Sequence, residues 1–279
     1  MNEPSIPRQR EHRLVPRRLI PAGSSDAPRA RARLARFLRL SFASIVLIAP
    51  SVAWSYSFVP TSEEWATWPP YCQAAYASIG YLRTKEFGGQ ISNAEIEHWQ
   101  SVLGNSWLGI WHYCAGLAEY GRVNFEPDPQ QRLHFLREAH DESLYVYRRL
   151  GPKDPLFFEV ATLYAQAKYD LGERTEAIGI LDDAIEKGPT VDRPYLVLSS
   201  LRRRSGDIQG AIDILTQGNA STNFASAEIN YALGLLYADR GAYASAMECA
   251  KRAYALGYPL PGLKKKLEKA GQWQPDRQN

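Results

Sequence analysis

The stretch GERTEAIGILDDAIEKGP, residues 172–189, decides the fold because two variants of it follow: GDIQGAIDILTQGN at 206–219 and GAYASAMECAKRAYALGYP at 241–259. Their first glycines are 34 and 35 residues apart. An alanine stands five places after each of these glycines: Ala177, Ala211 and Ala246. A repeat of this length predicts a helical hairpin, in which glycine forms the tight turn and alanine lets the second helix approach the first.

The residues after each alanine extend one apolar helix face. Leu181, Leu215 and Ala250 follow four positions later, which is one turn along the same side of a helix. Pro189 and Pro259 then end the second helix, because proline cannot continue a helix. Each repeat is therefore expected to form two antiparallel helices.

These features resemble the tetratricopeptide repeat (TPR) family. The third repeat is nearest and matches the family's main positions with Leu233, Gly234, Tyr237, Gly241, Ala246, Ala253 and Pro259. The first repeat departs from the family at Ala165 and Lys168, and the second at Arg202 and Gly218. The resemblance covers residues 158–259; it is specific as to fold and implies little about function.

The sequence on both sides of the repeats is also helical in pattern. We expect four earlier helices, from Pro70 to about Thr84, from Ser92 to Leu103, from Asn105 to Val123 and from Pro129 to Leu150. Ser92 and Glu95 have the spacing of a capping box. The last two helices resemble a further hairpin without the glycine and alanine signature.

We therefore expect an all-α fold, a right-handed α-solenoid of helical hairpins. Residues 63–155 are expected to form divergent hairpins, 158–259 three TPR-like repeats, and 260–273 a capping helix with one apolar stripe and a solvated lysine-rich face. Residues 1–39 are expected to be a disordered basic arm, and 40–62 an apolar signal or anchor helix.

The N-terminal arm differs from the rest of the chain in charge. Residues 1–40 hold ten arginines, no lysine and three acidic residues, so the remainder is net negative although the total is +3. An arm rich in Arg, Pro, Ala and Ser has little to bury, and its arginines favour the cytoplasmic side. Because the basicity is confined to this arm, we expect no nucleic-acid partner.

The segment 40–62 carries no charge. Arginines followed by apolar residues, Pro50 and small residues resemble a secretory signal peptide cleaved after Ser55. A bilayer span needs about 20 residues, so the segment is also long enough to anchor the chain in the inner membrane. Either alternative places the body on the periplasmic side, anchored or secreted, as in exported bacterial TPR proteins. A cytoplasmic TPR adaptor with a basic arm is the remaining alternative.

Two cysteines are expected to form a disulfide. Cys72 and Cys114 each lie on the apolar face of a predicted helix, so both point inward. In an oxidising compartment such a pair favours a disulfide, whose closure of the intervening loop contributes about 4 kcal/mol. Two free buried thiols are the alternative. Cys249, without a partner, is expected to be a core thiol.

No motif for catalysis, a cofactor or a metal is recognised. His112 and Cys114 would point about 200° apart on a helix, which does not suit one shared ion. His134, Glu138 and Asp141 have a spacing that suits a divalent ion, although a solvated helix face has the same spacing. We expect a non-enzymatic protein without cofactor or metal; an enzyme with an unrecognised site in 63–155 is the alternative.

The remaining candidate site is a groove along the first helices of the repeats. The TPR resemblance implies partner contacts at Glu159, Gln166, Tyr169, Asp170, Arg193, Arg203, Arg204, Glu228, Tyr231 and Asp239. The Lys and Asn with which TPR proteins clamp a terminal carboxylate are replaced by Thr162 and Gln166, and then by Leu196 and Ser200. That specific activity is therefore not expected.

The charges of this groove suggest the kind of partner. Arginines between acidic edges suit an acidic peptide segment, which they would hold by charge-assisted hydrogen bonds. Ordinary solvated charges are the alternative. The function expected from the sequence is an exported or membrane-anchored TPR scaffold for protein–protein interaction in a cell-envelope assembly.

Overall fold

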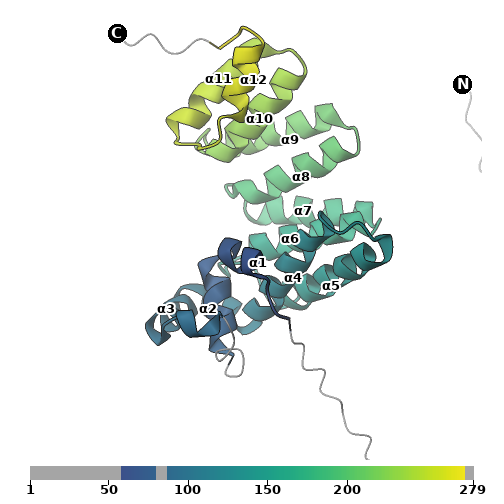
Figure 1. Cartoon of the computed structure of the whole chain (residues 1–279). Helices are drawn as coiled ribbons and strands as arrows, with labels where there is room; N and C mark the ends of the chain where they lie inside the picture. Colours follow the sequence, from purple (N-terminus) through teal and green to yellow (C-terminus); the bar gives the residue numbers. More distant parts are fainter. Residues whose placement is uncertain (1–57, 80–86, 274–279) are drawn as a thin grey trace, which may run out of the picture. The chain divides into compact units, whose positions relative to one another are not determined.

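The computed structural model describes residues 58–79 and 87–273. The chain divides into two units, Met1–Ser55 and Tyr56–Asn279, and every described residue belongs to the second. The described residues form helices and no strands, which confirms the all-α class (Figure 1). No helix among them is long and apolar enough to cross a bilayer. The basic arm and residues 40–57 of the expected anchor lie outside the described residues.

Three helical hairpins occupy the positions of the three sequence repeats. They are α6 (Phe157–Asp170) with α7 (Arg174–Lys187), α8 (Asp192–Arg204) with α9 (Ile208–Ser221), and α10 (Ala227–Asp239) with α11 (Tyr243–Ala255). The helices of each pair pack against each other, and each hairpin packs against the next. The chain therefore has the expected TPR-like array of hairpins.

The turns of these hairpins explain the repeated glycines. Gly172, Gly206 and Gly241 have φ angles of 98°, 86° and 73°, which other residues adopt only with strain. The alanine five places after each of them is fully buried. A larger side chain there would push the second helix away from the first, so both parts of the sequence signature have a structural cause.

A fourth hairpin precedes the repeats and is formed by α4 (Ile110–Val123) and α5 (Pro129–Tyr147). Here the close approach depends on Gly116 of α4, where an added Cβ would lie 3.3 Å from the carbonyl oxygen of Ala139. Ala139 of α5 is itself fully buried. Small residues therefore join this hairpin too, but at positions that differ from those of the repeats.

The N-terminal part of the unit consists of shorter elements. They are α1 (Ser62–Thr67), α2 (Pro70–Ser78), the 3₁₀ helix η2 (Gly88–Gln90), α3 (Asn93–Leu103) and the 3₁₀ helix η3 (Gly104–Gly109). The expected helix at 70 ends at Ser78, and residues 80–86 lie outside the described residues. The helix expected from Asn105 begins as η3 and becomes α-helical only at Ile110.

Capping explains two of these helix starts. The Ser92 hydroxyl accepts a hydrogen bond from the Glu95 N–H at 3.2 Å, which is the first half of the expected capping box. The complete box lies at α1, where Thr61 and Glu64 each accept from the backbone N–H of the other. The sequence pattern does not predict α1, because six residues are too few to show a helical period.

The folded unit begins earlier than the expected boundary at residue 62. The side chains of Phe58 and Pro60 are buried, and the Phe58 ring stacks on Trp68 with centroids 5.7 Å apart. The Arg122 guanidinium also contacts this ring, at 4.7 Å from the Phe58 centroid. Residues 58–62 therefore belong to the helical body.

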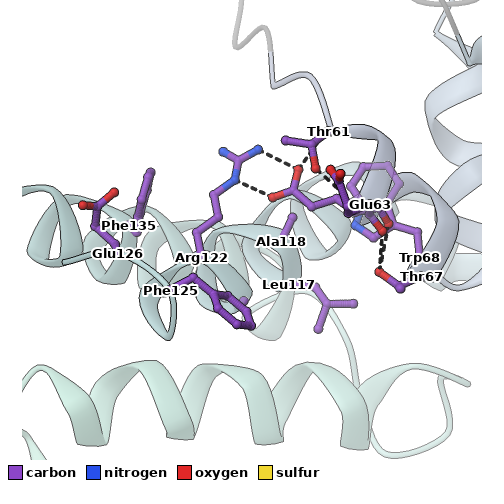
Figure 2. A pocket seen from close by; sticks show the side chains of 12 residues that line it. Thr61, Glu63, Thr67, Trp68, Leu117, Ala118, Arg122, Phe125, Glu126 and Phe135 are labelled. Atoms are coloured by element: carbon purple, nitrogen blue, oxygen red, sulfur yellow. Dashed lines mark hydrogen bonds and ion pairs between the residues drawn. The ribbon is translucent and has the colours of Figure 1, made fainter. Parts of the chain in front are cut away.

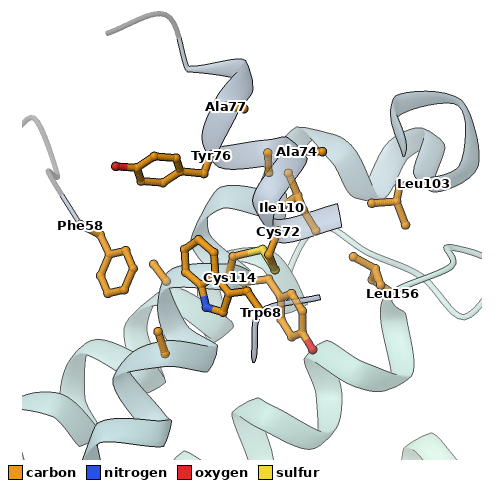
Figure 3. Close-up of a cluster of buried hydrophobic side chains, with 14 of the residues drawn as sticks. Phe58, Trp68, Cys72, Ala74, Tyr76, Ala77, Leu103, Ile110, Cys114 and Leu156 are labelled. Atoms are coloured by element: carbon orange, nitrogen blue, oxygen red, sulfur yellow. A yellow bond between two sulfur atoms is a disulfide. The ribbon is translucent and has the colours of Figure 1, made fainter. Parts of the chain in front are cut away.

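A disulfide joins Cys72 of α2 to Cys114 of α4, as the sequence predicts. Both side chains are completely buried, within a core that contains Trp68, Tyr76 and Ile110 (Figure 3). The bond connects α2, which has only nine residues, to a helix of the fourth hairpin. It therefore ties the short N-terminal elements to the regular array.

The C-terminal helix α12 (Gly262–Lys269) closes the last hairpin. Its Leu263 and Leu267 are fully buried, whereas the side chains of Lys264 and Lys265 are exposed. Leu263 packs onto α10 so closely that a Cβ added to Gly234 would lie 2.5 Å from it. This helix covers the apolar face of the last hairpin, as expected of a terminal cap.

Candidate binding groove

The first helices of the four hairpins form a continuous row. These helices, α4, α6, α8 and α10, are here called the A helices, and each packs against the next one in the series. The surface that they share is called the A-helix face. All ten residues of the expected groove belong to α6, α8 and α10. The groove expected from the sequence does not include α4, the first member of the row.

Three successive A helices meet at one carboxylate. The hydroxyl of Tyr120, on α4, donates a hydrogen bond of 2.7 Å to Oδ2 of Asp170, on α6. The guanidinium of Arg204, on α8, forms an ion pair with the same carboxylate. Burial raises the pKa of Tyr120 above its usual range, and Asp170 raises it further. The phenol therefore remains a donor at neutral pH.

This network changes the expected charge of the groove. Arg204 is already neutralised by Asp170, so its charge is shared with the protein's own carboxylate. Tyr169, which was expected to contact a partner, is only 6% exposed, and its hydroxyl donates to the Leu201 carbonyl oxygen at 3.2 Å. Arg204 also lies 5.3 Å from the centre of the Tyr169 ring. Tyr169, Asp170 and Arg204 therefore lie together on the A-helix face, where they contact the protein's own groups.

A second polar group lies where α2 and α4 meet the repeats. The rings of Tyr71 and Tyr113 are 6.5 Å apart. Burial raises the pKa of Tyr113 well above its usual range; Tyr71 and Glu159 raise it further, whereas Arg193 lowers it. Glu159 and Arg193, both expected groove residues, therefore lie near enough to this tyrosine pair to affect its ionisation.

A cavity of about 220 Å³ opens between α8 and α10. Its lining residues are Leu196, Ser199, Ser200, Arg203, Leu215, Ala232, Leu235, Leu236 and Asp239. Arg203 is exposed and makes no ion pair within 58–79 and 87–273, whereas Asp239 pairs with Lys266 of α12. The cavity can accept one aliphatic side chain next to an available guanidinium.

The remaining expected groove residues are dispersed. Tyr231 stacks on Tyr258 with ring centroids 4.1 Å apart, near the C-terminal end of the array. Gln166 is half-buried on α6, and Glu228 is exposed in the first turn of α10. The structure does not bring these three side chains to the cavity or to the Asp170 network.

Two residues of the A-helix face were not predicted from the sequence. Tyr113 and Tyr120 are seven positions apart, which is two turns on one side of α4, and this spacing is visible in the sequence. Leu196 and Leu235, by contrast, stand at positions where the TPR resemblance implies contacts. Both leucines line the cavity.

The residues considered for catalysis or metal binding can also be located in the structure. Cys72 is held in a buried disulfide and is not available as a nucleophile. His112 Nδ1 lies 2.6 Å from a Glu142 carboxylate oxygen. His134 lies 3.8 Å from Glu138, and both are solvent-accessible. In the part of the chain that the structure describes, no three His, Cys, Asp or Glu side chains gather in a way that could hold a metal ion.

Comparison with known proteins finds similar solved structures. The MamA protein is 18% identical, with 61% of this chain and 85% of that chain covered and a TM-score of 0.37. TTC0263, a thermophilic TPR protein of Thermus thermophilus, is 16% identical, with 60% and 96% covered and a TM-score of 0.40. Human IFIT1 in a dimer with m7Gppp-AAAA is 16% identical, with 72% and 48% covered and a TM-score of 0.42.

No family model and no curated protein sequence matches the chain. At such low identities and TM-scores, the similar structures give no information about partners. The assignment of a TPR-like fold rests on the hairpins of this chain, with their turn glycines and buried alanines.

Proposed function

We propose that this TPR-like chain is a non-enzymatic scaffold that holds a segment of a partner protein on its A-helix face. The observation that carries this proposal is the cavity between α8 and α10, with Arg203 at its rim. The cavity offers an apolar site for one side chain, and the guanidinium offers hydrogen bonds to a carboxylate. Asp170, Arg204 and Tyr120 hold the neighbouring helices in place.

The apolar contact in the cavity and the ion pair with Arg203 differ in strength, and they would recognise different side chains of the partner segment. Burying one leucine or isoleucine side chain contributes about 1.5–3 kcal/mol. An exposed arginine–carboxylate pair contributes about 0.2–1 kcal/mol. The aliphatic side chain therefore provides most of the affinity, and Arg203 selects a segment with Asp or Glu next to it. Arg193 is also exposed, and it extends this preference for acidic segments along α8.

We place this scaffold on the periplasmic side of the inner membrane, in a cell-envelope assembly. Support comes from the buried disulfide, because such bonds persist in oxidising compartments. It comes also from the basic arm followed by the uncharged segment 40–62. The buried body begins at Phe58, so either cleavage after Ser55 or anchoring through the preceding residues leaves the body intact.

Peptide binding tests the scaffold function. The full chain would be titrated with a short synthetic peptide that carries one leucine between two aspartates, and with versions in which alanine or lysine replaces these residues. We expect binding of the Leu/Asp peptide and weaker binding of both altered peptides. Leu235→Asp and Arg203→Glu should each weaken binding, whereas Glu186→Lys, on the exposed side of α7, should not. Equal binding by all peptides would contradict the proposal.

A reporter fusion tests the location independently. An alkaline phosphatase domain fused after Asn279 is expected to be active in cells, because this enzyme requires an oxidising compartment for its disulfides. An inactive phosphatase would contradict export and favour a cytoplasmic adaptor. That result would leave the peptide-binding test unaffected, so the two parts of the proposal can fail separately.

A further inference from the structure

A second and larger cavity, of about 730 Å³, opens between α1, α4 and the turn that leads to α5 (Figure 2). Its apolar lining includes Trp68, Leu117 and Phe135. Arg122, which also lines it, follows Tyr120 by two positions on α4, which is about 200° around the helix. Because Tyr120 reaches towards α6, this cavity lies on a different side of α4 from the A-helix face.

Among the described residues that line the cavity, the only cation is Arg122, and its guanidinium is already paired. Arg122 donates from Nε and Nη2 to the two carboxylate oxygens of Glu64, at 2.6 and 2.8 Å. Its Nη1 donates to Glu119 at 3.0 Å. Two carboxylates therefore surround a single guanidinium, and little positive charge remains to attract an acidic ligand. This arrangement distinguishes the cavity from the groove, where Arg203 has no such partner among the described residues.

The rim of the cavity is acidic and apolar. Glu63 and Glu126 both line it, and neither forms an ion pair within the described ranges. In Figure 2 their side chains lie on either side of Arg122. Phe125, beside Glu126, is 88% exposed, although a side chain of this size normally buries much of its surface. The rim thus combines uncovered aromatic surface with two separated negative charges.

We infer that this cavity binds a basic amphipathic segment of a partner protein. An aromatic or large aliphatic side chain of the segment enters the hollow and covers Phe125. Lysine or arginine residues on either side of it pair with Glu63 and Glu126. The charge complementarity is opposite to that of the A-helix face, so the scaffold has two surfaces for two kinds of segment. This second surface goes beyond the proposed function and does not depend on it.

A basic amphipathic peptide tests this inference. The probe is a synthetic helical peptide with one face of leucine and phenylalanine flanked by lysines, and its counterpart has glutamate for every lysine. Binding to the full chain would be followed by fluorescence anisotropy. We expect the lysine probe to bind and the glutamate counterpart not to bind. Neutralising both rim charges with Glu63→Gln and Glu126→Gln should weaken binding about tenfold, because two exposed ion pairs are lost.

A matched control separates the rim from net charge. Glu97→Gln with Glu186→Gln changes the net charge by the same amount at exposed sites on α3 and α7, and should leave the affinity unchanged. Phe125→Ser should weaken binding without lowering the thermal unfolding temperature, since Phe125 is exposed. Tighter probe binding in Arg203→Glu, whose added carboxylate would attract the lysines, together with unchanged binding in the Glu63 and Glu126 variant, would assign the probe to the groove and contradict the inference. A dimer that Phe125→Ser dissociates would also contradict it, since a second copy would then occupy the cavity.

Discussion

Arg204 of α8 forms an ion pair with Asp170 of α6, so one side-chain contact joins two successive repeats across the A-helix face. Tyr120 of α4 donates to the same carboxylate and extends the connection to the preceding hairpin. In a repeat array each hairpin contacts only its neighbours, so the stability of the whole depends on such interfaces. This contact therefore helps to hold α6 and α8, two helices of the groove, in place relative to each other.

Removing the two partners of this ion pair should have unequal effects. Arg204→Ala is expected to lower the free energy of unfolding by less than about 1 kcal/mol, because the arginine is partly exposed. Asp170→Ala should cost about 1–3 kcal/mol, because the half-buried Tyr120 hydroxyl then loses its acceptor. Urea denaturation of both variants and of the double variant measures the coupling. A coupling of zero would show that the ion pair does not join the repeats.

The disulfide should be the strongest single constraint on the N-terminal elements. It joins residues separated by 42 positions, so Cys72→Ala with Cys114→Ala should lower the free energy of unfolding by about 4 kcal/mol. The loss should concentrate in α2 and α3, whose amide hydrogens would exchange faster. An unchanged unfolding free energy would contradict the structural role of the bond.

Thiol counting checks the disulfide without a mutation. The chain has 3 cysteines, and Cys249 is buried, which raises the pKa of its thiol to about 11 and keeps it unreactive. We expect no alkylation of the native protein, one label in denaturant alone, and all 3 cysteines labelled in denaturant with reductant. Because the bonded sulfurs are buried, reductant without denaturant is not sufficient. Complete labelling in denaturant alone would mean free thiols.

Two glycine substitutions should have opposite effects. Gly234→Ala places a methyl group 2.5 Å from Leu263 and 3.1 Å from Cys249, so it should loosen α12 and destabilise the chain by about 1–3 kcal/mol. Gly179→Ala, on α7, meets nothing within 4 Å and should stabilise by about 1 kcal/mol through helix propensity. Thermal unfolding compares them. A stabilising effect of Gly234→Ala would contradict the tight packing of α12 against α10.

The regular part of the fold could be predicted from the sequence because its causes are local. A turn glycine with positive φ and a small residue five positions later recur with each repeat, and each has a steric cause. The same pattern does not predict how α4 and α5 pack, because Gly116 and Ala139 make that contact at positions that the repeats do not use. Helix α1 was missed because its six residues depend on a capping box and on the ion pair between Glu64 and Arg122 of α4.

The candidate site was predictable only in part. The TPR resemblance placed Arg203 and Asp239 on the A helices, and both line the cavity between α8 and α10. It did not predict that Arg204 is neutralised by Asp170, because that contact depends on which long side chains of neighbouring repeats meet. The larger cavity was not anticipated at all, since it forms between segments distant in the sequence.

Alkaline pH should destabilise the chain through Tyr113, which is buried, and Tyr120, which is half-buried. The pKa values of Tyr113 and Tyr120 are raised above the usual 10.0, first by burial. The folded chain therefore keeps these protons while the unfolded chain loses them, so stability is full below pH 10.0 and falls as the pH rises above it. Tyr113→Phe should make this loss less steep in urea denaturation measured across that range. An equally steep loss of stability with pH in Tyr113→Phe would show that Tyr113 does not cause it.

We propose that the A-helix face holds a partner, and photo-crosslinking in cells tests this. A photoreactive amino acid would replace Ser200 at the cavity or Glu186 on the exposed side of α7, in the full chain. We predict that one specific protein is crosslinked from Ser200 and not from Glu186, and that this crosslink is lost when Leu235→Asp is added. If the same proteins are crosslinked from both positions, or if the crosslink from Ser200 persists in Leu235→Asp, the A-helix face does not hold the partner.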